Sequence, residues 1–401
     1  MKSLHLLVIT SRIPFPIEKG DKLRVFYQLK YLSKFHRISL VSLCENQSEI
    51  DKAKSVLSEY CESMSFYILP KWKRYINLPF GLLNNLPFSV QYFYHSGIAK
   101  KIKKHILNLN PDHIYCQLIR TAPYVRKLPF SKTIDYMDSF SLGAKRRANE
   151  SPFFSKILMK IEAGLLANYE SEVFNDFNAH SIISVQDKMS LKILSKEKIT
   201  VIPNGVDTSF FYPNESVEKK YDLLLCGNMG YYPNILAAKV LYSLLDEIKI
   251  KYPDLKVLIA GARPHPSVRA MDGKKGVTVS GWMDDIREAY WSSKINIAPI
   301  FTGSGLQNKM LEAMACGLPC LTTEVVADSI GGLDGKHYSV AADESELVVK
   351  LEELLSDAVL AKRLGGGGFD LVNSKFSWSS SVDGLNKIIK EGSEVDIFGV
   401  N

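Results

Sequence analysis

The 401-residue sequence has no run of 18 or more apolar residues, so no segment is predicted to span a membrane. Residues 1–12 contain a short apolar core without a small-residue cleavage site, which predicts a buried strand rather than a signal peptide. The six cysteines are scattered and form no C-x-x-C pair, so they are expected to be reduced thiols, mostly in the core. These absences favour a cytoplasmic protein.

Several catalytic and binding patterns are also missing. No G-x-G-x-x-G follows the first predicted strand, which argues against a nicotinamide-dependent Rossmann enzyme. No zinc-ligand, helix-turn-helix or aromatic RNA-binding pattern is present, which argues against nucleic acid as a partner. No Asp-x-Asp pair follows a predicted strand, and Asp284-Asp285 is typical of a helix start. We therefore expect no catalytic metal and no cofactor.

The charge of the chain is unevenly distributed. Residues 1–110 contain 17 Lys and Arg against 7 Asp and Glu, whereas the whole chain has a net charge of +7. Such a basic segment suits anionic lipid headgroups or a lipid-diphosphate acceptor. Cations alternate with apolar groups at residues 71–80 and 100–104, as in interfacial segments. The first stretch contains Lys71, Lys73 and Arg74 near Trp72 and Phe80. Phe88 and Phe93 follow the first stretch in the sequence. The alternative is that the cations form the solvated face of a helix.

Short apolar runs alternate with amphipathic segments along the chain, which predicts βαβ units and parallel sheets. A Pro/Asn/Gly-rich turn at residues 201–213 is a plausible interdomain linker. The run Gly365–Gly368 is expected to break or hinge a helix. We expect an α/β protein with an N-terminal domain at residues 1–200, a C-terminal domain at 210–375 and a final helix at 376–401.

The strongest chemical signal lies in residues 298–320. A strand is expected to end near Ile300, and the loop Gly303-Ser304-Gly305 leads to a helix that begins at about Leu306. Glycines and a helix N-terminus offer backbone N–H groups to a diphosphate without a metal. Lys309 adds a full charge, and Glu312, one turn further, can accept hydrogen bonds from a ribose diol. The alternative is a plain strand-to-helix turn with Lys309 and Glu312 as a surface ion pair.

The run Lys309-Met-Leu-Glu-Ala-Met-Ala-Cys-Gly-Leu-Pro319 resembles the donor-site motif of glycosyltransferase family 4, retaining enzymes of GT-B fold. The resemblance covers nearly the whole chain. It includes the interdomain segment at 201–207, the start of the C-terminal domain at 223–230, the base-binding turn Val279-Ser-Gly-Trp282 and the returning helix after Phe376-Ser-Trp378. Gly-Ser-Gly before the helix, Gly20-Asp-Lys-x-Arg24 and Met229-Gly-Tyr-x-Pro-Asn234 resemble an exopolysaccharide-associated subgroup.

This resemblance implies two Rossmann-like domains that face each other across a cleft, with the C-terminal helix packed back on the N-terminal domain. It implies a retaining, metal-independent hexosyltransferase that moves a sugar from a nucleotide-diphosphate sugar to a glycan or lipid-linked acceptor in cell-surface polysaccharide biosynthesis. The acceptor is expected on the N-terminal domain, at the inner face of the cell membrane. The residues expected to bind the donor are Gly20, Gly227, Asn228, Gly281, Trp282, Gly303, Ser304, Gly305, Leu306, Lys309 and Glu312.

Two positions depart from the family pattern. The family has a glutamate eight residues before Glu312, where this chain has Ser304, which leaves open how the donor sugar is held. Relatives carry Arg and Lys in the loop after Cys226, where this chain has Asn228 and Met229; Arg263 or Lys309 is expected to supply the charge.

The N-terminal half contributes fewer candidates. Relatives often carry a histidine after a middle strand; residues 135–139 contain none, and Asp138 is the candidate for a polar role there, with a helix N-cap as the alternative. The expected catalytic residues are therefore Asp138, Lys309 and Arg263. Asp21 is predicted to cap a helix that follows Gly20. Lys22 and Arg24 either contact phosphate or an anionic acceptor or are exposed cations of that helix.

Two other functions use a related architecture. A nucleotide-sugar 2-epimerase of GT-B fold would need a carboxylate and histidine set, and the N-terminal half is poor in histidine. A non-catalytic nucleotide-sugar-binding homologue is supported by the missing first glutamate.

Overall fold

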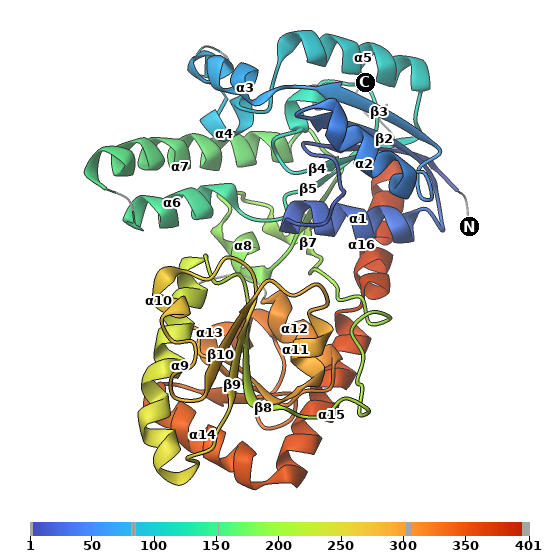
Figure 1. Ribbon diagram of the computed structural model, residues 1–401. Helices are drawn as coiled ribbons and strands as arrows, with labels where there is room; N and C mark the ends of the chain where they lie inside the picture. Colours follow the sequence, from blue (N-terminus) through green and yellow to red (C-terminus); the bar gives the residue numbers. More distant parts are fainter. Residues whose placement is uncertain (1–2, 82, 84–85, 151, 302–306, 395–401) are drawn as a thin grey trace. The chain divides into compact units, whose positions relative to one another are not determined.

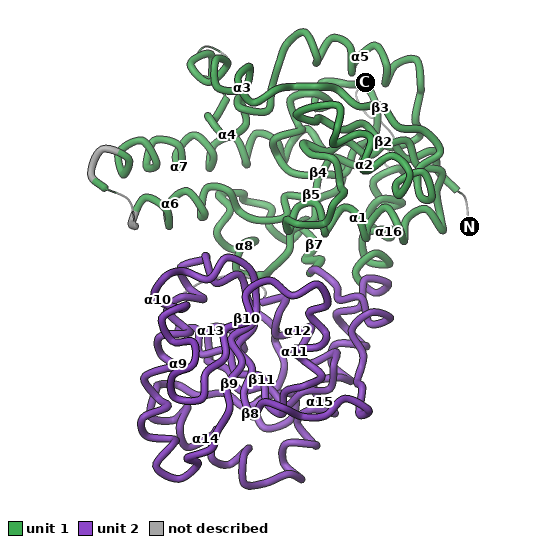
Figure 2. The backbone as a smooth tube through the Cα atoms, viewed as in Figure 1, with its two compact units in different colours: residues 1–203, 381–401 green, residues 204–380 purple. Residues whose placement is uncertain are grey.

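The computed structural model describes residues 3–81, 83, 86–150, 152–301 and 307–394. The chain divides into two compact units (Figure 2): unit 1 comprises residues 1–203 and 381–401, and unit 2 comprises residues 204–380. Both units consist of a parallel sheet with helices (Figure 1). The expected α/β class and GT-B-type pair of Rossmann-like units are confirmed.

The sheet of unit 1 has the strand order β3-β2-β1-β4-β5-β6-β7 among the described residues, and its pairs are parallel. Its strands are β1 (His5–Thr10), β2 (Arg37–Cys44), β3 (Ser63–Ile68), β4 (His113–Gln117), β5 (Lys132–Asp135), β6 (Ala179–Ile182) and β7 (Ile199–Val201). Strands β2 and β3 are added on one side of β1, and β4 to β7 on the other. The direction in which successive strands are added therefore reverses between β1 and β4. Open parallel sheets bind ligands at the carboxyl ends of the strands beside such a reversal point.

The helices of unit 1 are α1 (Gly20–Leu32), α2 (Gln47–Leu57), α3 (Lys71–Asn77), α4 (Phe88–Gln91), α5 (Ser96–Leu109), α6 (Phe140–Glu150), α7 (Phe153–Phe174) and α8 (Val185–Ser190), with 3₁₀ turns η1 (Leu78–Gly81), η2 (Ala122–Tyr124) and η3 (Lys196–Lys198). Helices α6 and α7 pack on each other as a hairpin (Figure 1). From residue 381 onward, α16 (Trp378–Glu394) belongs to this unit. Its Leu385 and Ile389 are buried with Leu6 and Val8 of β1.

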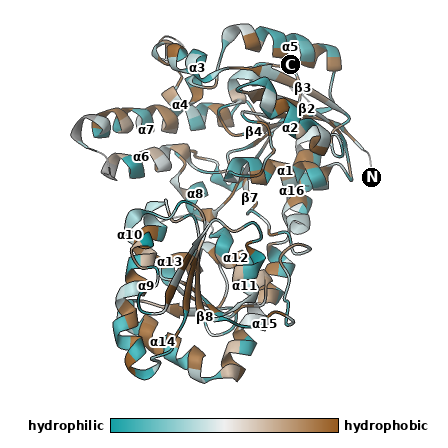
Figure 3. Ribbon diagram, viewed as in Figure 1, coloured by the Kyte–Doolittle hydropathy of each residue, from teal (hydrophilic) through white to brown (hydrophobic). Residues whose placement is uncertain are grey.

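The sheet of unit 2 has the order β10-β9-β8-β11-β12-β13 among the described residues, again with parallel pairs. Its strands are β8 (Tyr221–Cys226), β9 (Val257–Ala260), β10 (Val277–Gly281), β11 (Ser293–Ala298), β12 (Cys320–Thr323) and β13 (Ser339–Ala341). These strands are largely hydrophobic (Figure 3), as expected for a sheet covered on both faces. The reversal point lies between β8 and β11.

The helices of unit 2 are α9 (Tyr232–Lys251), α10 (Pro266–Arg269), α11 (Arg287–Trp291), α12 (Asn308–Ala315), α13 (Glu324–Ile330), α14 (Glu344–Ser356) and α15 (Ala358–Lys375). The expected break at Gly365–Gly368 is wrong, because α15 continues through these residues. A Cβ at Gly365 would lie 2.3 Å from the Gly317 carbonyl oxygen, and one at Gly367 would lie 2.0 Å from that of Lys336. The glycines therefore allow the helix to approach neighbouring backbone closely.

Among the described residues, no helix combines the length and the apolar composition that crossing a bilayer requires. All six cysteines are free thiols, and five of them are buried.

Candidate active site

An ion pair in the first turn of α12 marks the reversal point of unit 2. The Lys309 Nζ lies 2.9 Å from Oε2 and 3.2 Å from Oε1 of Glu312, and the Tyr290 hydroxyl of α11 donates to the same Oε2 at 2.9 Å. The Glu312 side chain is only 13% exposed, whereas that of Lys309 is 44% exposed. The pair is therefore not a plain surface contact: the carboxylate is fixed from two sides, and the Lys309 side chain remains partly exposed.

The electrostatics keep Lys309 positively charged. Burial of Lys309 would lower its pKa, but the neighbouring Glu312 carboxylate outweighs this effect and raises the pKa overall. Burial raises the pKa of the Cys226 thiol to about 11, so this thiol is neutral at physiological pH. A fixed ammonium at the carboxyl edge of the sheet suits an anionic ligand.

The loops after β8 and β9 are held together through their backbones. A Cβ at Gly261, whose φ is +134°, would lie 1.8 Å from the Gly227 carbonyl oxygen. The Asn228 side chain accepts a hydrogen bond from the Gly230 N–H at 3.0 Å, and the Asn228 carbonyl accepts one from the Asn234 side chain at 3.0 Å. Gly227 and Asn228 therefore form a tightly bonded turn directly after β8.

Arg263, Gly281 and Trp282 come together after β9 and β10, where they line a cavity of about 600 Å³. The Trp282 indole is 73% exposed, and its N–H donates to the Asp284 carboxylate at 3.3 Å. Arg263 and Gly281 both have φ in the left-handed region, at +55° and +69°. The structure thus places a cation and a flat aromatic ring on one cavity at the carboxyl edge.

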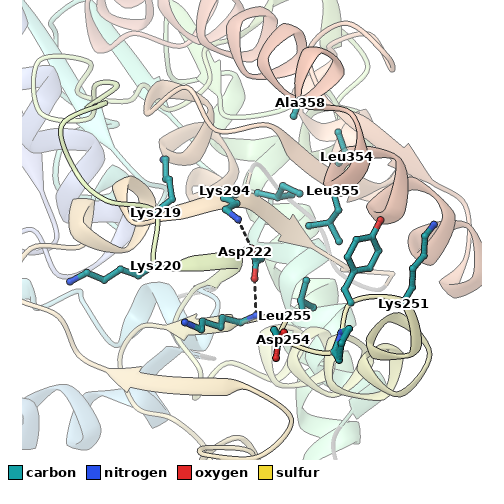
Figure 4. Close-up of a pocket in the computed structure, with 15 residues that line it drawn as sticks. Lys219, Lys220, Asp222, Lys251, Asp254, Leu255, Lys294, Leu354, Leu355 and Ala358 are labelled. Atoms are coloured by element: carbon teal, nitrogen blue, oxygen red, sulfur yellow. Dashed lines mark hydrogen bonds and ion pairs between the residues drawn. The ribbon is translucent and has the colours of Figure 1, made fainter.

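A further cavity of unit 2, of about 850 Å³, lies at the opposite edge of the sheet (Figure 4). It is lined at the amino ends of β8, β9 and β11 by Asp222, Lys256 and Lys294, and Lys294 pairs with Asp222 at 2.8 Å. Because ligands of open parallel sheets bind at the carboxyl ends, this cavity is not the expected donor site.

Four of the expected donor-binding residues, Gly303, Ser304, Gly305 and Leu306, lie outside the described residues. Helix α12 begins at Asn308, two residues after the expected start.

In unit 1, Asp138 follows β5 and lines a cavity of about 840 Å³. Although Asp138 is exposed, the surrounding walls restrict the hydration of its carboxylate. This desolvation and the nearby Asp187 raise its pKa to about 6, against the opposing effects of Arg24 and Arg120. Asp138 is not the N-cap of α6, because the hydroxyl of Ser139 accepts the hydrogen bond from the Leu142 N–H at 3.3 Å.

Gly20 is the first residue of α1 rather than the residue before it. A Cβ at Gly20 would meet the Met137 side chain at 3.4 Å, an ordinary contact, so packing does not require a glycine here. The N-cap of α1 is Lys19, so the expected Asp21 cap is wrong; Asp21 lies in the first turn and forms an ion pair with Arg12.

Both alternatives for Arg24, a contact with phosphate or an anionic acceptor and an exposed cation of the helix, are wrong. Its side chain is completely buried, and its Nε and Nη2 donate to the two carboxylate oxygens of Asp135 at 2.6 and 3.1 Å. Arg74 and Phe93 are likewise buried, so neither is part of an exposed interfacial segment. The half-buried Phe88 lines the same cavity as Asp138.

A helix was expected at residues 286–292, but no sequence pattern indicated a role for its Tyr290, which lies 22 residues before Glu312. Arg12 and Arg120 were also missed; they follow β1 and β4 and line the Asp138 cavity. Their position after strands beside the reversal point is the signal that would have found them.

Residues 220–357 match the family model described as Glycosyl transferases group 1. The chain is a glycosyltransferase. It is 27% identical over 250 residues to the capsular polysaccharide biosynthesis glycosyltransferase CapM of Staphylococcus aureus, covering 56% of this chain and 66% of CapM. It is 24% identical over 362 residues to an uncharacterized 44.6 kDa protein in the cps region of Klebsiella pneumoniae, covering 84% of this glycosyltransferase and 88% of that protein.

Solved structures share the fold of this glycosyltransferase. Anabaena Alr3699/HepE in complex with UDP and glucose has a TM-score of 0.67 at 12% identity, covering 96% of this chain and 99% of that one. Sucrose-phosphate synthase from Thermosynechococcus elongatus has a TM-score of 0.66 at 14% identity, covering 96% and 98%. The GT-B fold is thereby confirmed.

Proposed function

We propose that this glycosyltransferase is a retaining, metal-independent enzyme that moves a sugar from a nucleotide-diphosphate sugar to a glycan or lipid-linked acceptor in cell-surface polysaccharide biosynthesis. The observation that carries the proposal is the fixed Lys309–Glu312–Tyr290 arrangement at the reversal point of unit 2. Solved structures of similar fold contain UDP and UDP-glucose, and CapM is named for capsular polysaccharide biosynthesis. These likenesses support the choice of donor class and process.

The donor roles follow from the position of each group. The Lys309 ammonium and the start of α12 bind the diphosphate, Arg263 adds a second cation, and the exposed Trp282 ring stacks on the base. The Glu312 carboxylate keeps its bonds to Lys309 and Tyr290 and accepts from the ribose diol with its remaining lone pairs. In unit 1, the Gly20 N–H at the start of α1 is assigned to phosphate binding. The turn after β8 is shaped by Gly227 and Asn228, and the turn after β10 by Gly281. Phosphate binding is also assigned to Gly303, Ser304, Gly305 and Leu306.

In the transfer step, the bond between the anomeric carbon and the diphosphate oxygen breaks while a bond to the acceptor oxygen forms on the same face. The acceptor proton passes to the departing diphosphate, which leaves with the bonding electron pair. Negative charge therefore develops on the leaving group, where Lys309 and Arg263 stabilise it. Asp138 is a polar partner for the reacting hydroxyl groups.

A direct test incubates the protein with UDP-, GDP- and ADP-sugars and measures nucleotide release with and without extracted glycan and lipid-linked acceptors. Acceptor-dependent release with retained anomeric configuration in the product supports the proposal. Conversion of the donor sugar to its 2-epimer without acceptor would identify an epimerase instead. Binding of a donor without any turnover would indicate a non-catalytic homologue.

Transfer should not depend on a divalent cation, because Lys309, Arg263 and backbone N–H groups supply the positive charge at the diphosphate. The rate in excess EDTA should equal the rate in buffer that contains Mg²⁺ or Mn²⁺. A rate that falls to background in EDTA and returns with either ion would contradict this assignment.

Asp138 should impose a pH dependence on the reaction. Because its pKa is raised to about 6, the carboxyl is protonated below that pH and ionised above it. If the ionised form assists the acceptor, kcat/KM should rise with pH through about 6. The Asp138→Asn variant should lose this pH dependence and have a lower plateau rate. Its thermal stability at neutral pH should be no lower, because the raised pKa means that the fold disfavours the ionised carboxylate. An identical pH profile at full rate in that variant would assign Asp138 no part in transfer.

We also propose reversible attachment to an anionic membrane through the α3–η1 segment, residues 71–81. Its Trp72, Tyr75, Ile76 and Phe80 side chains are exposed, and Lys71 and Lys73 are exposed beside them. Large apolar side chains next to cations complement an anionic lipid surface, where each cation contributes about 1 kcal/mol.

The expected result is sedimentation with anionic vesicles at low ionic strength and release at ~0.5 M salt, where charges are screened. Replacing Lys71 and Lys73 with glutamine should weaken the attachment. The matched control replaces Lys103 and Lys104 of α5, which are equally exposed cations, and should bind like the unmodified protein. Equal loss in both variants would mean that binding reflects net charge alone.

A further inference from the structure

The cavity beside Asp138 lies at the reversal point of unit 1. Arg12 follows β1, Arg120 follows β4, and Asp138 and Ser139 follow β5, so the carboxyl ends of three adjacent strands provide its floor. Its volume of about 840 Å³ is within the range of sites for small organic ligands. This is the position at which an open parallel sheet binds a ligand.

Arg120 provides a cation with an unsatisfied donor in this cavity. Its buried Nε is without an acceptor among the described residues. The Asp21 and Asp138 carboxylates lie close enough to favour its charged form. It is held between two aromatic rings, 4.8 Å from the centre of Phe93 and 4.9 Å from that of Phe140. Burial and the nearby Arg12 lower its pKa to about 10, so it is still charged at neutral pH. A half-buried guanidinium whose Nε lacks an acceptor is stabilised by an anionic ligand.

The other walls of the cavity are mainly apolar. They are formed by η1, α4 and α7 through Leu78, Pro79, Tyr92, Leu158 and Met159. Glu162 of α7 holds two of these elements together, because its carboxylate accepts from the Phe88 and Ser89 N–H groups at 2.8 and 2.9 Å. Both oxygens of that carboxylate therefore already accept from backbone donors, which stabilise its negative charge.

The apolar wall continues to the outside of the unit. Leu78 and Pro79 line the cavity, and they belong to the α3–η1 segment that exposes Trp72, Ile76 and Phe80 to solvent. A ligand with an apolar chain can therefore extend from the cavity along this segment. A guanidinium at the floor and an apolar path outward complement an amphiphile whose anionic group is at one end.

We propose that this cavity binds a long-chain alkyl phosphate or diphosphate ester, with the phosphate on Arg120 and Arg12 and the first carbons of the chain on the wall formed by Leu158 and Met159. The inference rests on the proposed transferase function, for which it narrows the acceptor to a lipid-linked phosphate. Asp138 then lies on the same cavity as the acceptor.

The test is calorimetric titration of the full chain with geranyl phosphate, geraniol and inorganic phosphate. Geranyl phosphate should bind at least about tenfold more tightly than either part alone, since each part satisfies one portion of the cavity. Arg120→Gln should weaken geranyl phosphate binding roughly 10- to 100-fold, the range for one charged hydrogen bond. Leu158→Asp, at a partly exposed position, should also weaken it. Arg146→Gln, on the same helix as Gly143 but outside the cavity, should have no effect.

Titration with UDP in the same variants separates the two proposals. UDP binding that is unchanged in Arg120→Gln and Leu158→Asp, together with lost geranyl phosphate binding, supports the cavity as a distinct acceptor site. Geranyl phosphate binding that is unaffected by both substitutions overturns the inference, as does inorganic phosphate or geraniol binding as tightly as the ester. A protein that binds UDP but no geranyl phosphate retains the proposed function and loses only this acceptor assignment.

Discussion

Replacing Lys309 with glutamine is expected to lower kcat by roughly 10²- to 10³-fold, the cost of removing one preorganised donor that stabilises developing charge. Lys309 is the cation next to the reversal point of unit 2, and its position is fixed by Glu312, whose carboxylate is itself held by Tyr290. Because the ammonium does not need to reorganise during the reaction, its full charge acts on the leaving diphosphate.

Steady-state kinetics with saturating donor would measure this loss. Glutamine retains a donor toward Glu312, so the melting temperature should change little. The matched control is Lys294→Gln, which breaks the ion pair with Asp222 at the opposite edge of the same sheet and should leave kcat unchanged. Near-normal turnover in a folded Lys309→Gln protein would remove Lys309 from the catalytic machinery and leave Arg263 as the proposed cation.

The placement of Lys309 and Glu312 shows what a sequence can reveal. Two residues three positions apart on a helix share a face, so their proximity follows from helix geometry. The strands of both units were predictable for a similar reason, because buried parallel strands are short continuous apolar runs. Such features depend on local periodicity, and the structure confirms the α/β elements that carry them.

Contacts between distant positions could not be predicted in the same way. Tyr290 approaches Glu312 because α11 and α12 flank β11, and the hydroxyl direction depends on packing. The sequence alone predicts that Arg24 is an accessible cation, because charged residues are seldom completely buried. Its partner, Asp135, is 111 residues away, so only the fold reveals the ion pair that makes its burial possible.

The glycines of α15 illustrate the limits of propensity. A run of four glycines disfavours a helix because each loses much backbone entropy on folding. In the structure, the close approach of the Gly317 and Lys336 carbonyls leaves no room for side chains at Gly365 and Gly367. Tertiary packing therefore determines the conformation of this glycine run, and no local sequence pattern predicts it.

Replacing Arg24 with methionine is expected to reduce the free energy of unfolding by about 3–5 kcal/mol, because it leaves the Asp135 charge buried without its cation. Burial alone would raise the pKa of Asp135, but Arg24 outweighs burial and lowers it, so the carboxylate is ionised in the native protein. Tyr115, Gln28 and Ser181 also donate to this carboxylate, at 3.0, 3.4 and 3.0 Å, but they carry no charge.

The loss would appear as a lower urea midpoint for the transition of unit 1. Arg37→Met is the matched control: its distant, exposed contact with Glu62 at 3.9 Å should contribute less than about 1 kcal/mol. The double variant Arg24→Met/Asp135→Asn should recover much of the stability, because the uncompensated charge is gone. If Arg24→Met is as stable as the control, then the pair does not anchor α1 to β5. If the expected loss is found, Arg24 is a positioning residue: it fixes the helix that begins at Gly20 against the strand that leads to Asp138, without contacting substrate.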